Sequence, residues 1–294
     1  MDYTNKTYKV MGFVLPTFIL YAVFCLYPMV VSLYYSMLDW NGGPTQRFIL
    51  FDNFVTMFQD RSFFLSLRNS LYAAGYGIFI KLPIAMFLAV VMSHRLTKIS
   101  NFFRFTYFLP AILSSASIAL MWQFIYDPNY GLLSQFLNSI GLGSLIIQSG
   151  WLGDYNKAIF FALIPKIWSS VGWNFVLYSA GIGSISNELY EAAEIDGAGF
   201  FRKTFGITLP LMRDVIIISM ILDLAGSLQN FDMIYILTKG GPANSTHVMA
   251  TYMHQEAFKY QKMGYGSAIA FMIFLLSMVY TLVLKIATRK SITD

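Results

Sequence analysis

This chain has little charge, because only 12% of its 294 residues are Asp, Glu, Lys or Arg, about half of the ~25% typical of soluble domains. Its single cysteine, Cys25, excludes a disulfide framework. It also lacks the G-x-x-x-x-G-K-[ST] pattern of a P-loop and the H-E-x-x-H and G-x-S-x-G patterns of hydrolases. These absences argue against a soluble catalytic domain, and the chain is predicted not to be an enzyme.

Apolar residues are abundant instead. They make up 56% of the chain, aromatic residues alone make up 17%, and the mean hydropathy is +0.57. This composition is typical of a protein that contacts membrane lipid. The net charge of +5 does not indicate a nucleic-acid partner, because the basic residues are scattered between hydrophobic runs.

Six stretches are long and apolar enough to cross a bilayer, which needs about 20 residues per helix. The first is too long for the apolar region of a signal peptide, and no small-residue cleavage site follows it. We therefore predict an all-α, polytopic membrane protein with a single transmembrane domain over residues 1–294. The predicted spans are 10–36, 71–92, 105–126, 159–182, 215–237 and 265–286.

The distribution of Lys and Arg predicts the orientation. With both termini in the cytoplasm, eleven basic residues, Lys6, Lys9 and Arg95 among them, fall on the cytoplasmic side and seven on the outer side. The short loop 93–104 carries three basic residues and no acidic one. We therefore predict a multi-pass protein whose outer segments are 37–70, 127–158 and 238–264.

The predicted cytoplasmic loop 185–213 is the longest polar stretch in the second half of the chain. Asn187 is a candidate N-cap, and Glu188 and Glu191 follow where the helix dipole favours acidic residues. Gly197 and Gly199 are expected to stop this helix after about ten residues. A helix that lies on lipid headgroups should be basic, so the acidic composition favours docking into a pocket of another protein.

The stretch "EAAEIDGAGFFRKTFGITLP" resembles the EAA loop of binding-protein-dependent ABC importer permeases. The stretches "FFRFTYFLPAILS", "WQFIYDPNYGLL", "NFDMIYILTKGGPANST" and "YGSAIAFMIFLL" are similar to the carbohydrate branch of that family, and to the larger permease of maltose-type systems. The resemblance covers residues 10–288. The positions that match the EAA pattern are Glu191, Ala192, Ala193, Gly197, Ile207, Leu209 and Pro210.

The resemblance implies a type I ABC importer permease in the plasma membrane of a bacterium. Such a subunit forms half of the translocation pathway for a carbohydrate, an oligosaccharide or a larger glycan. The implied partners are a second homologous permease that completes a heterodimer, a cytoplasmic ABC ATPase dimer, an extracytoplasmic sugar-binding protein and membrane lipid. ATP and Mg²⁺ would bind the ATPase, and this chain would bind no cofactor. The implied ATPase-coupling residues are Glu191, Ala192, Ala193 and Gly197.

Two polar stripes with helical spacing interrupt the fourth and fifth predicted spans. Each stripe follows the i, i+3, i+4, i+7 pattern of one helical face, and polar groups at this depth are costly in lipid. They serve either to join helices, as small and polar residues do in membranes, or to bind a substrate. The stripes are Lys166, Ser169, Ser170 and Trp173, and Asp223, Gly226, Ser227 and Asn230.

The resemblance favours substrate binding, because maltose-type permeases contact sugar from these segments. The maltose-type pattern has an amide near position 166 and a tyrosine near 173, whereas this chain has Lys and Trp. This departure argues against maltose itself and favours a larger or differently substituted glycan. The implied sugar contacts are Lys166, Ser169, Ser170, Trp173, Gly226, Ser227 and Asn230.

Lys81, Lys166 and Asp223 are the deepest charges in the predicted spans, while Asp232 lies nearer the outer end of the fifth span. Ionisable residues within a membrane are functional candidates by default. Either Lys81 or Lys166 could form an ion pair with Asp223. We predict that Lys81 does so and that Lys166 faces a water-filled translocation path. An alternative is an ion-coupled secondary transporter that uses Lys166 and Asp223, although such a protein should show inverted repeats and would need no EAA loop. No metal site is predicted, because no cysteine or carboxylate cluster accompanies His247 and His254.

Overall fold

The computed structural model describes residues 12, 14–93, 98–147 and 149–288. The predictions for Lys6, Lys9 and Arg95 and for residues 10, 11 and 13 lie outside these residues. Helices dominate the described part of the chain, and its strands form a single two-stranded sheet, which confirms the all-α prediction. The described chain groups into two compact units, residues 1–61 with 253–275 and residues 62–252 with 276–294.

The first unit contains a long N-terminal helix, Val14–Ser36, and a short antiparallel hairpin in which Leu38 lies opposite Phe48. The side-chain amide of Asn53 donates to the backbone oxygens of Ser36 and Leu38, at 2.9 Å each, and so fixes the start of the hairpin. The hairpin was not predicted. The elements are η1 (Ala22–Leu26), α2 (Tyr27–Ser36), β1 (Leu38–Trp40), β2 (Gln46–Phe48), α3 (Asp52–Gln59) and η5 (Gln255–Lys259).

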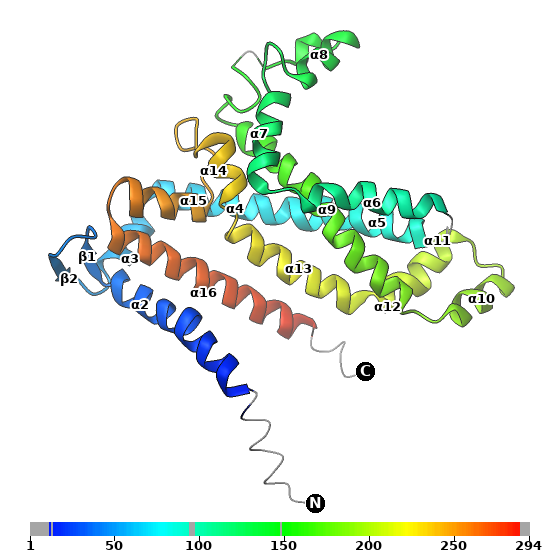
Figure 1. Cartoon of the computed structure of the whole chain (residues 1–294), viewed down its shortest axis with the longest axis horizontal. Coiled ribbons are helices and arrows are strands. Elements are labelled where there is room, and N and C mark those ends of the chain that lie inside the picture. Colours follow the sequence, from blue (N-terminus) through cyan, green and yellow to red (C-terminus); the bar gives the residue numbers. More distant parts are fainter. Residues whose placement is uncertain (1–11, 13, 94–97, 148, 289–294) are drawn as a thin grey trace, which may run out of the picture. The chain divides into compact units, whose positions relative to one another are not determined.

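The second unit is built around the helix α9, which contacts α5, α6, α7, α13 and α14 (Figure 1). Helices α15 and α16 contribute residues to both units. The elements are α4 (Arg61–Tyr76), η2 (Gly77–Lys81), α5 (Leu82–Ser93), α6 (Lys98–Ile112), α7 (Ser115–Ile125), α8 (Leu132–Ser139), η3 (Gly143–Leu145), α9 (Ala158–Gly183), α10 (Asn187–Ile195), α11 (Phe200–Lys203), η4 (Thr204–Thr208), α12 (Leu209–Leu211), α13 (Arg213–Leu228), α14 (Asp232–Thr238), α15 (Met249–His254) and α16 (Met263–Thr288).

Helices α9 and α16 agree with the predicted fourth and sixth spans to within two residues. The second span differs, because α4, η2 and α5 form one continuous helix of 33 residues, Arg61–Ser93. At a rise of 1.5 Å per residue it is about 50 Å long. Its first ten residues had been predicted to belong to an outer loop, so the helix projects beyond the span expected from hydropathy alone.

The predicted third and fifth spans are not single straight helices. Phe105–Ile112 and Ser115–Ile125 meet at 103°, because Ser114 is extended and its hydroxyl accepts from the amide of Ser117, which starts a new helix. In the fifth span, α13 ends at Leu228 and α14 begins at Asp232. The second bent pair lies earlier in the chain, where Phe200–Leu211 and Arg213–Leu228 meet at 66°, so this helical span begins inside the predicted loop 185–213. The described chain has four helices long enough to cross a membrane, or six when each of these two bent pairs forms one span.

Two apolar clusters organise the second unit. The α7–α14 cluster is built around Ile118, Leu163 and Ile234, and the α5–α9 cluster around Phe175 and Tyr178. Along α9, the buried members of the first cluster end at Leu163, and those of the second begin at Phe175. About three turns of α9 separate the two clusters, and these turns carry the polar stripe of the fourth span.

Candidate functional site

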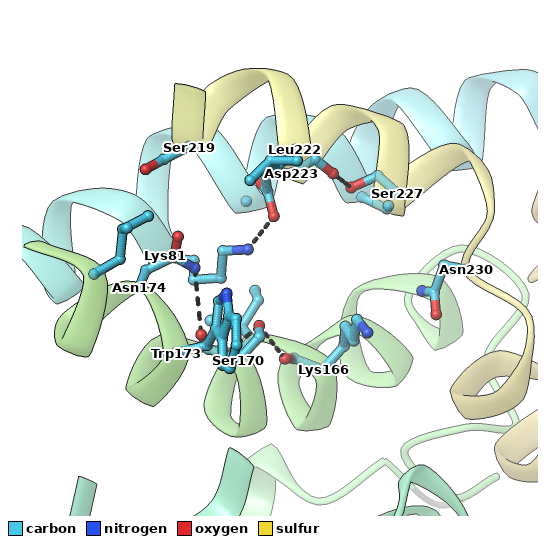
Figure 2. Close-up of a pocket in the computed structure, with 15 residues that line it drawn as sticks. Lys81, Lys166, Ser170, Trp173, Asn174, Ser219, Leu222, Asp223, Ser227 and Asn230 are labelled. Carbon is cyan, nitrogen blue, oxygen red and sulfur yellow. Dashed lines mark hydrogen bonds and ion pairs between the residues drawn. The ribbon is translucent and has the colours of Figure 1, made fainter. Parts of the chain in front are cut away.

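A polar pocket lies between the two apolar clusters, where η2, α9 and α13 approach one another (Figure 2). Its volume is about 240 Å³. The polar side chains are concentrated at mid-length on these helices, and such a gathering is unusual in a lipid-embedded protein. The lining residues are Ala73, Gly77, Lys81, Lys166, Ile167, Ser170, Trp173, Asn174, Leu177, Ser219, Leu222, Asp223, Gly226, Ser227 and Asn230.

The fold brings together six of the seven residues predicted to contact sugar. They come from α9, from α13 and from the break that follows α13. Ser169 is the exception: it is buried outside the pocket, and its hydroxyl donates to the backbone oxygen of Lys166 at 3.1 Å. The six that line the pocket are Lys166, Ser170, Trp173, Gly226, Ser227 and Asn230.

The expected helical register of the second stripe fails at Asn230. Helix α13 ends at Leu228, so Asn230 reaches the pocket from a non-helical segment rather than from the next turn of a helix. Asparagine and aspartate compete with helical backbone hydrogen bonds, and both Asn230 and Asp232 occur at this break. Asn230 therefore lines the pocket from outside α13 rather than from the predicted helical face.

Ser170 and Ser227 donate hydrogen bonds only within their own helices, whereas the hydroxyl of Ser219 on α13 also lies beside that of Tyr178 on α9. Ser170 donates to the oxygen of Lys166 at 2.6 Å, Ser219 to that of Val215 at 2.8 Å, and Ser227 to that of Asp223 at 2.8 Å. Each bond lies within a single helix. The hydroxyl oxygens retain lone pairs that can accept a hydrogen bond from a ligand.

Lys81 and Asp223 form an ion pair between η2 and α13. The two side chains are only 8% and 10% exposed. The predicted pairing of these two residues is thereby confirmed. Gly77 makes room for the carboxylate, because a Cβ at this position would lie 1.6 Å from Asp223 Oδ2.

Lys166 forms no salt bridge within the part of the chain that the structure describes. Its charge is attracted by Asp223 and Asp232 and repelled by Lys81, but neither carboxylate lies within ion-pair distance. Figure 2 shows the Lys166 side chain extending toward the end of the pocket where Asn230 lies.

Trp173 and Asn230 complete the polar side of the pocket. Trp173 is 64% exposed although it lies in the middle of a long membrane helix. Asn230 is buried, yet no hydrogen bond joins its side chain to another described residue. A large free aromatic face and an unused amide are therefore both available to a ligand.

Sequence reasoning missed several residues of the pocket, among them Gly77, Asn174 and Ser219. Asn174 and Ser219 extend the two stripes by one turn each, at i+4 from Ser170 and i−4 from Asp223, so a longer periodic search would have found them. Gly77 carries no such signal. Its importance depends on a contact with a residue 146 positions later in the chain.

The loop 185–213, predicted to be cytoplasmic, contains the predicted helix, which is α10, although its caps differ from the prediction. Ser186, not Asn187, is the N-cap, and its hydroxyl accepts from the amide of Glu188. Gly197 has φ +74°, and its amide donates to Glu194 while that of Ala198 donates to Ala193, which is a Schellman ending. Gly199 does not stop α10, because it is the N-cap of α11.

Helix α10 is tied to the rest of the loop by two side-chain contacts. The hydroxyls of Tyr190 and Thr208 lie 3.0 Å apart, and Lys203 forms a salt bridge of 2.6 Å with Glu194. The predicted coupling residues Glu191 and Ala192 are exposed, as is Gly197, while Ala193 is half-buried. Figure 1 shows α10 far from α8, at the other end of the second unit.

The histidines give no sign of a metal site in the described residues. No group of three His, Cys, Asp or Glu side chains gathers there. His247 is buried, and its Nδ1 lies 3.0 Å from the hydroxyl of Thr251. His94 lies outside the described residues. The absence of a metal remains a prediction.

Comparison with known proteins places these features in one family. Residues 81–292 match the family model described as "Binding-protein-dependent transport system inner membrane component". The chain is 35% identical over 272 residues to the probable ABC transporter permease protein YurN of Bacillus subtilis, covering 92% of each chain. It is 32% identical to the diacetylchitobiose uptake system permease of Streptomyces coelicolor, covering 92% of this chain and 79% of that one.

A solved structure has the same fold. A chain from a bacterial ABC transporter involved in import of the acidic polysaccharide alginate superposes with a TM-score of 0.84 at 24% identity, over 99% of this chain and 98% of that chain. The family consists of permease subunits rather than enzymes. The chain belongs to the binding-protein-dependent transport system inner membrane components, and is therefore the membrane-spanning permease subunit of an ABC transporter.

Proposed function

We propose that this permease forms half of the translocation pathway for a carbohydrate, and that the pocket between η2, α9 and α13 contacts the sugar. The observation that carries the proposal is the cluster of polar groups between the two apolar clusters, in which the side chains of Lys166 and Asn230 have no polar partner among the described residues. Polar groups at this depth are costly unless they serve packing or a ligand. The hydroxyls of Ser170 and Ser227 bond within their own helices and not between helices, which favours a ligand.

The chemistry of the pocket suits a sugar. The exposed face of Trp173 can pack against the apolar face of a pyranose ring. The Asn230 amide and the Lys166 ammonium group can donate to hydroxyl oxygens, and the serine oxygens can accept from hydroxyl hydrogens. A volume of about 240 Å³ is below the ~300–1,000 Å³ of most ligand pockets, consistent with one wall of a site that a second permease completes.

The named substrates of relatives support a carbohydrate. Besides the diacetylchitobiose permease, relatives are named for transport of sulfoquinovosyl glycerol in Agrobacterium fabrum, arabinooligosaccharides in Bacillus subtilis and lactose in Rhizobium radiobacter. These sugars differ in size and charge. Family membership therefore supports a carbohydrate as the class of substrate. It does not identify the substituents of the sugar, which must be inferred from the pocket of this chain.

The assembly that we propose contains a second homologous permease, a cytoplasmic ABC ATPase dimer and an extracytoplasmic sugar-binding protein. One solved neighbour is an alginate ABC transporter in complex with a pentasaccharide-bound periplasmic protein. ATP and Mg²⁺ would be held by the ATPase, because this chain has no P-loop. Both termini would lie in the cytoplasm, on the same side as α10.

We propose that α10 transmits the motion of the ATPase to the pocket. Tyr190 on α10 contacts Thr208, and Thr208 lies one turn before Met212, which belongs to the α5–α9 cluster. Helix α13 then starts at Arg213 and carries Asp223 and Ser227 into the pocket. A displacement of α10 would thereby reach the sugar site through packed groups rather than through a flexible loop.

The test is transport by the complete transporter in proteoliposomes, with its binding protein and a panel of radiolabelled oligosaccharides. Loss of one buried hydrogen-bond partner costs about 1–3 kcal/mol, so we expect Asn230→Ala and Trp173→Ala each to lower uptake roughly tenfold or more. Matched controls are Trp168→Ala, on the same helix, and Gln229→Ala, the exposed neighbour of Asn230; neither residue lines the pocket. Unchanged uptake in both pocket variants would assign the stripe to helix packing.

A further inference from the structure

The charges that line the pocket do not balance. Three ionisable residues contribute to its wall, the two lysines Lys81 and Lys166 and the one carboxylate of Asp223. Two positive charges and one negative charge leave a net charge of +1. Lys81 and Asp223 neutralise each other in their ion pair, so the excess charge belongs to Lys166.

The Lys81–Asp223 pair is not available to a ligand. Both side chains are about nine-tenths buried, and the carboxylate rests against the backbone at Gly77, where no Cβ could fit. Displacing either partner would leave the other charge buried without a counter-ion, which is strongly unfavourable. The pair is part of the helix packing, and it cannot also serve as the counter-ion of Lys166.

Asp232 is the other carboxylate that attracts Lys166, and it does not neutralise the pocket either. It lies at the start of α14, is exposed, and does not line the pocket. No salt bridge between it and Lys166 forms. Solvent and salt also screen the attraction between Lys166 and an exposed carboxylate that lies beyond ion-pair distance.

We propose that the sugar imported through this pocket carries an anionic oxygen group, a carboxylate or a sulfonate, which binds between Lys166 and Asn230. The inference rests on the proposed function, because it assigns a substituent to the sugar at the same site. Lys166 has three N–H donors, and the unused Asn230 amide has two, at the end of the pocket toward which Lys166 extends (Figure 2). A charge-assisted hydrogen bond is about twice as strong as a neutral one.

A neutral sugar would fit these groups less well. It would displace water from a half-buried ammonium group without supplying the opposite charge, and removal of water from an unpaired charge is costly. An anionic sugar supplies that charge and lets Trp173 hold the ring while Lys166 and Asn230 hold the substituent. The pocket would therefore select for the charge of the sugar as well as for its ring.

The experiment compares matched sugars in proteoliposomes that contain the complete transporter and its binding protein. The probes are neutral gluco-, galacto- and manno-oligosaccharides, the corresponding oligouronates, and 6-sulfonated analogues of the neutral sugars. We expect uptake of an anionic set only, and the two anionic sets distinguish a carboxylate from a sulfonate.

Variants of Lys166 connect the result to the pocket. We expect Lys166→Met to lower kcat/KM for the anionic sugar roughly 10- to 100-fold, the effect of losing a hydrogen bond to a charged group, and Lys166→Arg to retain most of the uptake. Lys157→Met, which changes an exposed lysine just before α9, serves as the matched control.

Two results would overturn the inference in distinguishable ways. Transport of a neutral set with equal kcat/KM in the wild type and in Lys166→Met would refute the anionic substituent while leaving the sugar importer intact. Absence of uptake for every set, together with ATPase activity that no sugar-loaded binding protein stimulates, would instead count against the proposed function itself.

Discussion

The ion pair between Lys81 and Asp223 depends on a residue that has no side chain. Gly77 lies one turn before Lys81, and the space that a Cβ would fill there is taken by the Asp223 carboxylate. Two neighbouring glycines on this helix thus differ in role, because a Cβ at Gly75 would meet no atom within 4 Å. The pair locks η2 onto α13 beside the proposed sugar site.

We therefore expect Gly77→Ala to destabilise the protein and Gly75→Ala to leave it unchanged or slightly more stable. The added methyl group at position 77 must displace the carboxylate from Lys81, and disruption of a buried pair costs up to about 3–5 kcal/mol. Alanine in place of a helical glycine otherwise adds about 0.5–1 kcal/mol of stability. Thermal unfolding of the purified variants in detergent measures both effects; equal melting temperatures for the two would contradict the assigned role of Gly77.

At the scale of elements, the contacts that stabilise the fold of α10 do not depend on the ATPase to which we propose that it binds. Its N-cap, its Schellman ending and its links to Thr208 and Lys203 lie within this chain. Its exposed surface includes Glu191 and the apolar side chain of Ile195, which is 87% exposed. An exposed apolar side chain beside an unpaired carboxylate suits a protein cleft better than water.

Reversing the charge of Glu191 should therefore affect coupling and not folding. We expect Glu191→Lys to leave expression and pairing with the second permease intact, and to weaken association of the ATPase roughly 10- to 100-fold, because a hydrogen bond to a charged group contributes about 1.5–3 kcal/mol. Co-purification of the ATPase and sugar-stimulated ATP hydrolysis measure this effect.

Asp214→Lys provides the control, since Asp214 is also an exposed acidic residue but lies at the start of α13, outside α10. If Glu191→Lys retains normal coupled hydrolysis and uptake, α10 is a surface helix without a coupling role.

At the scale of the whole molecule, much apolar surface stays uncovered by this chain. Of the described residues within the N-terminal helix Val14–Ser36, only Ser36 is buried. We expect the apolar side chains of this helix to contact lipid or the proposed second permease. The arrangement of spans relative to the membrane follows from the distribution of basic residues.

That distribution predicts that α10 faces the cytoplasm and that the segment before α9 faces the outside. We expect cysteines at Asp196 and Asn156, both exposed, to react with a membrane-impermeant maleimide from opposite sides. The background should be Cys25→Ser, because the native thiol is exposed. Labelling of Asp196→Cys only after permeabilisation, and of Asn156→Cys in intact cells, is the expected result. Reaction of both from the same side would refute this topology.

Local pattern by itself determined the class of the fold and most of the polar residues that line the pocket. Runs of about 20 apolar residues require helices in lipid, and α9 and α16 begin and end within two residues of prediction. The polar spacing on α9 and α13 identified Lys166, Ser170, Trp173 and Ser227 before any contact was known, because one helical face is visible in a periodic sequence.

Tertiary structure decided what depends on neighbours distant in the sequence. The 103° bend after Ile112 falls inside a stretch that is apolar enough to form one span, and the break at Asn230 falls inside a predicted span. Apolar content indicates burial in lipid and not the direction of a helix. The role of Gly77 and the choice of Lys81 over Lys166 as the partner of Asp223 depend on which helices approach closely enough for contact. An ion pair requires its two atoms within a few ångströms, and only the packing of η2 against α13 sets that distance.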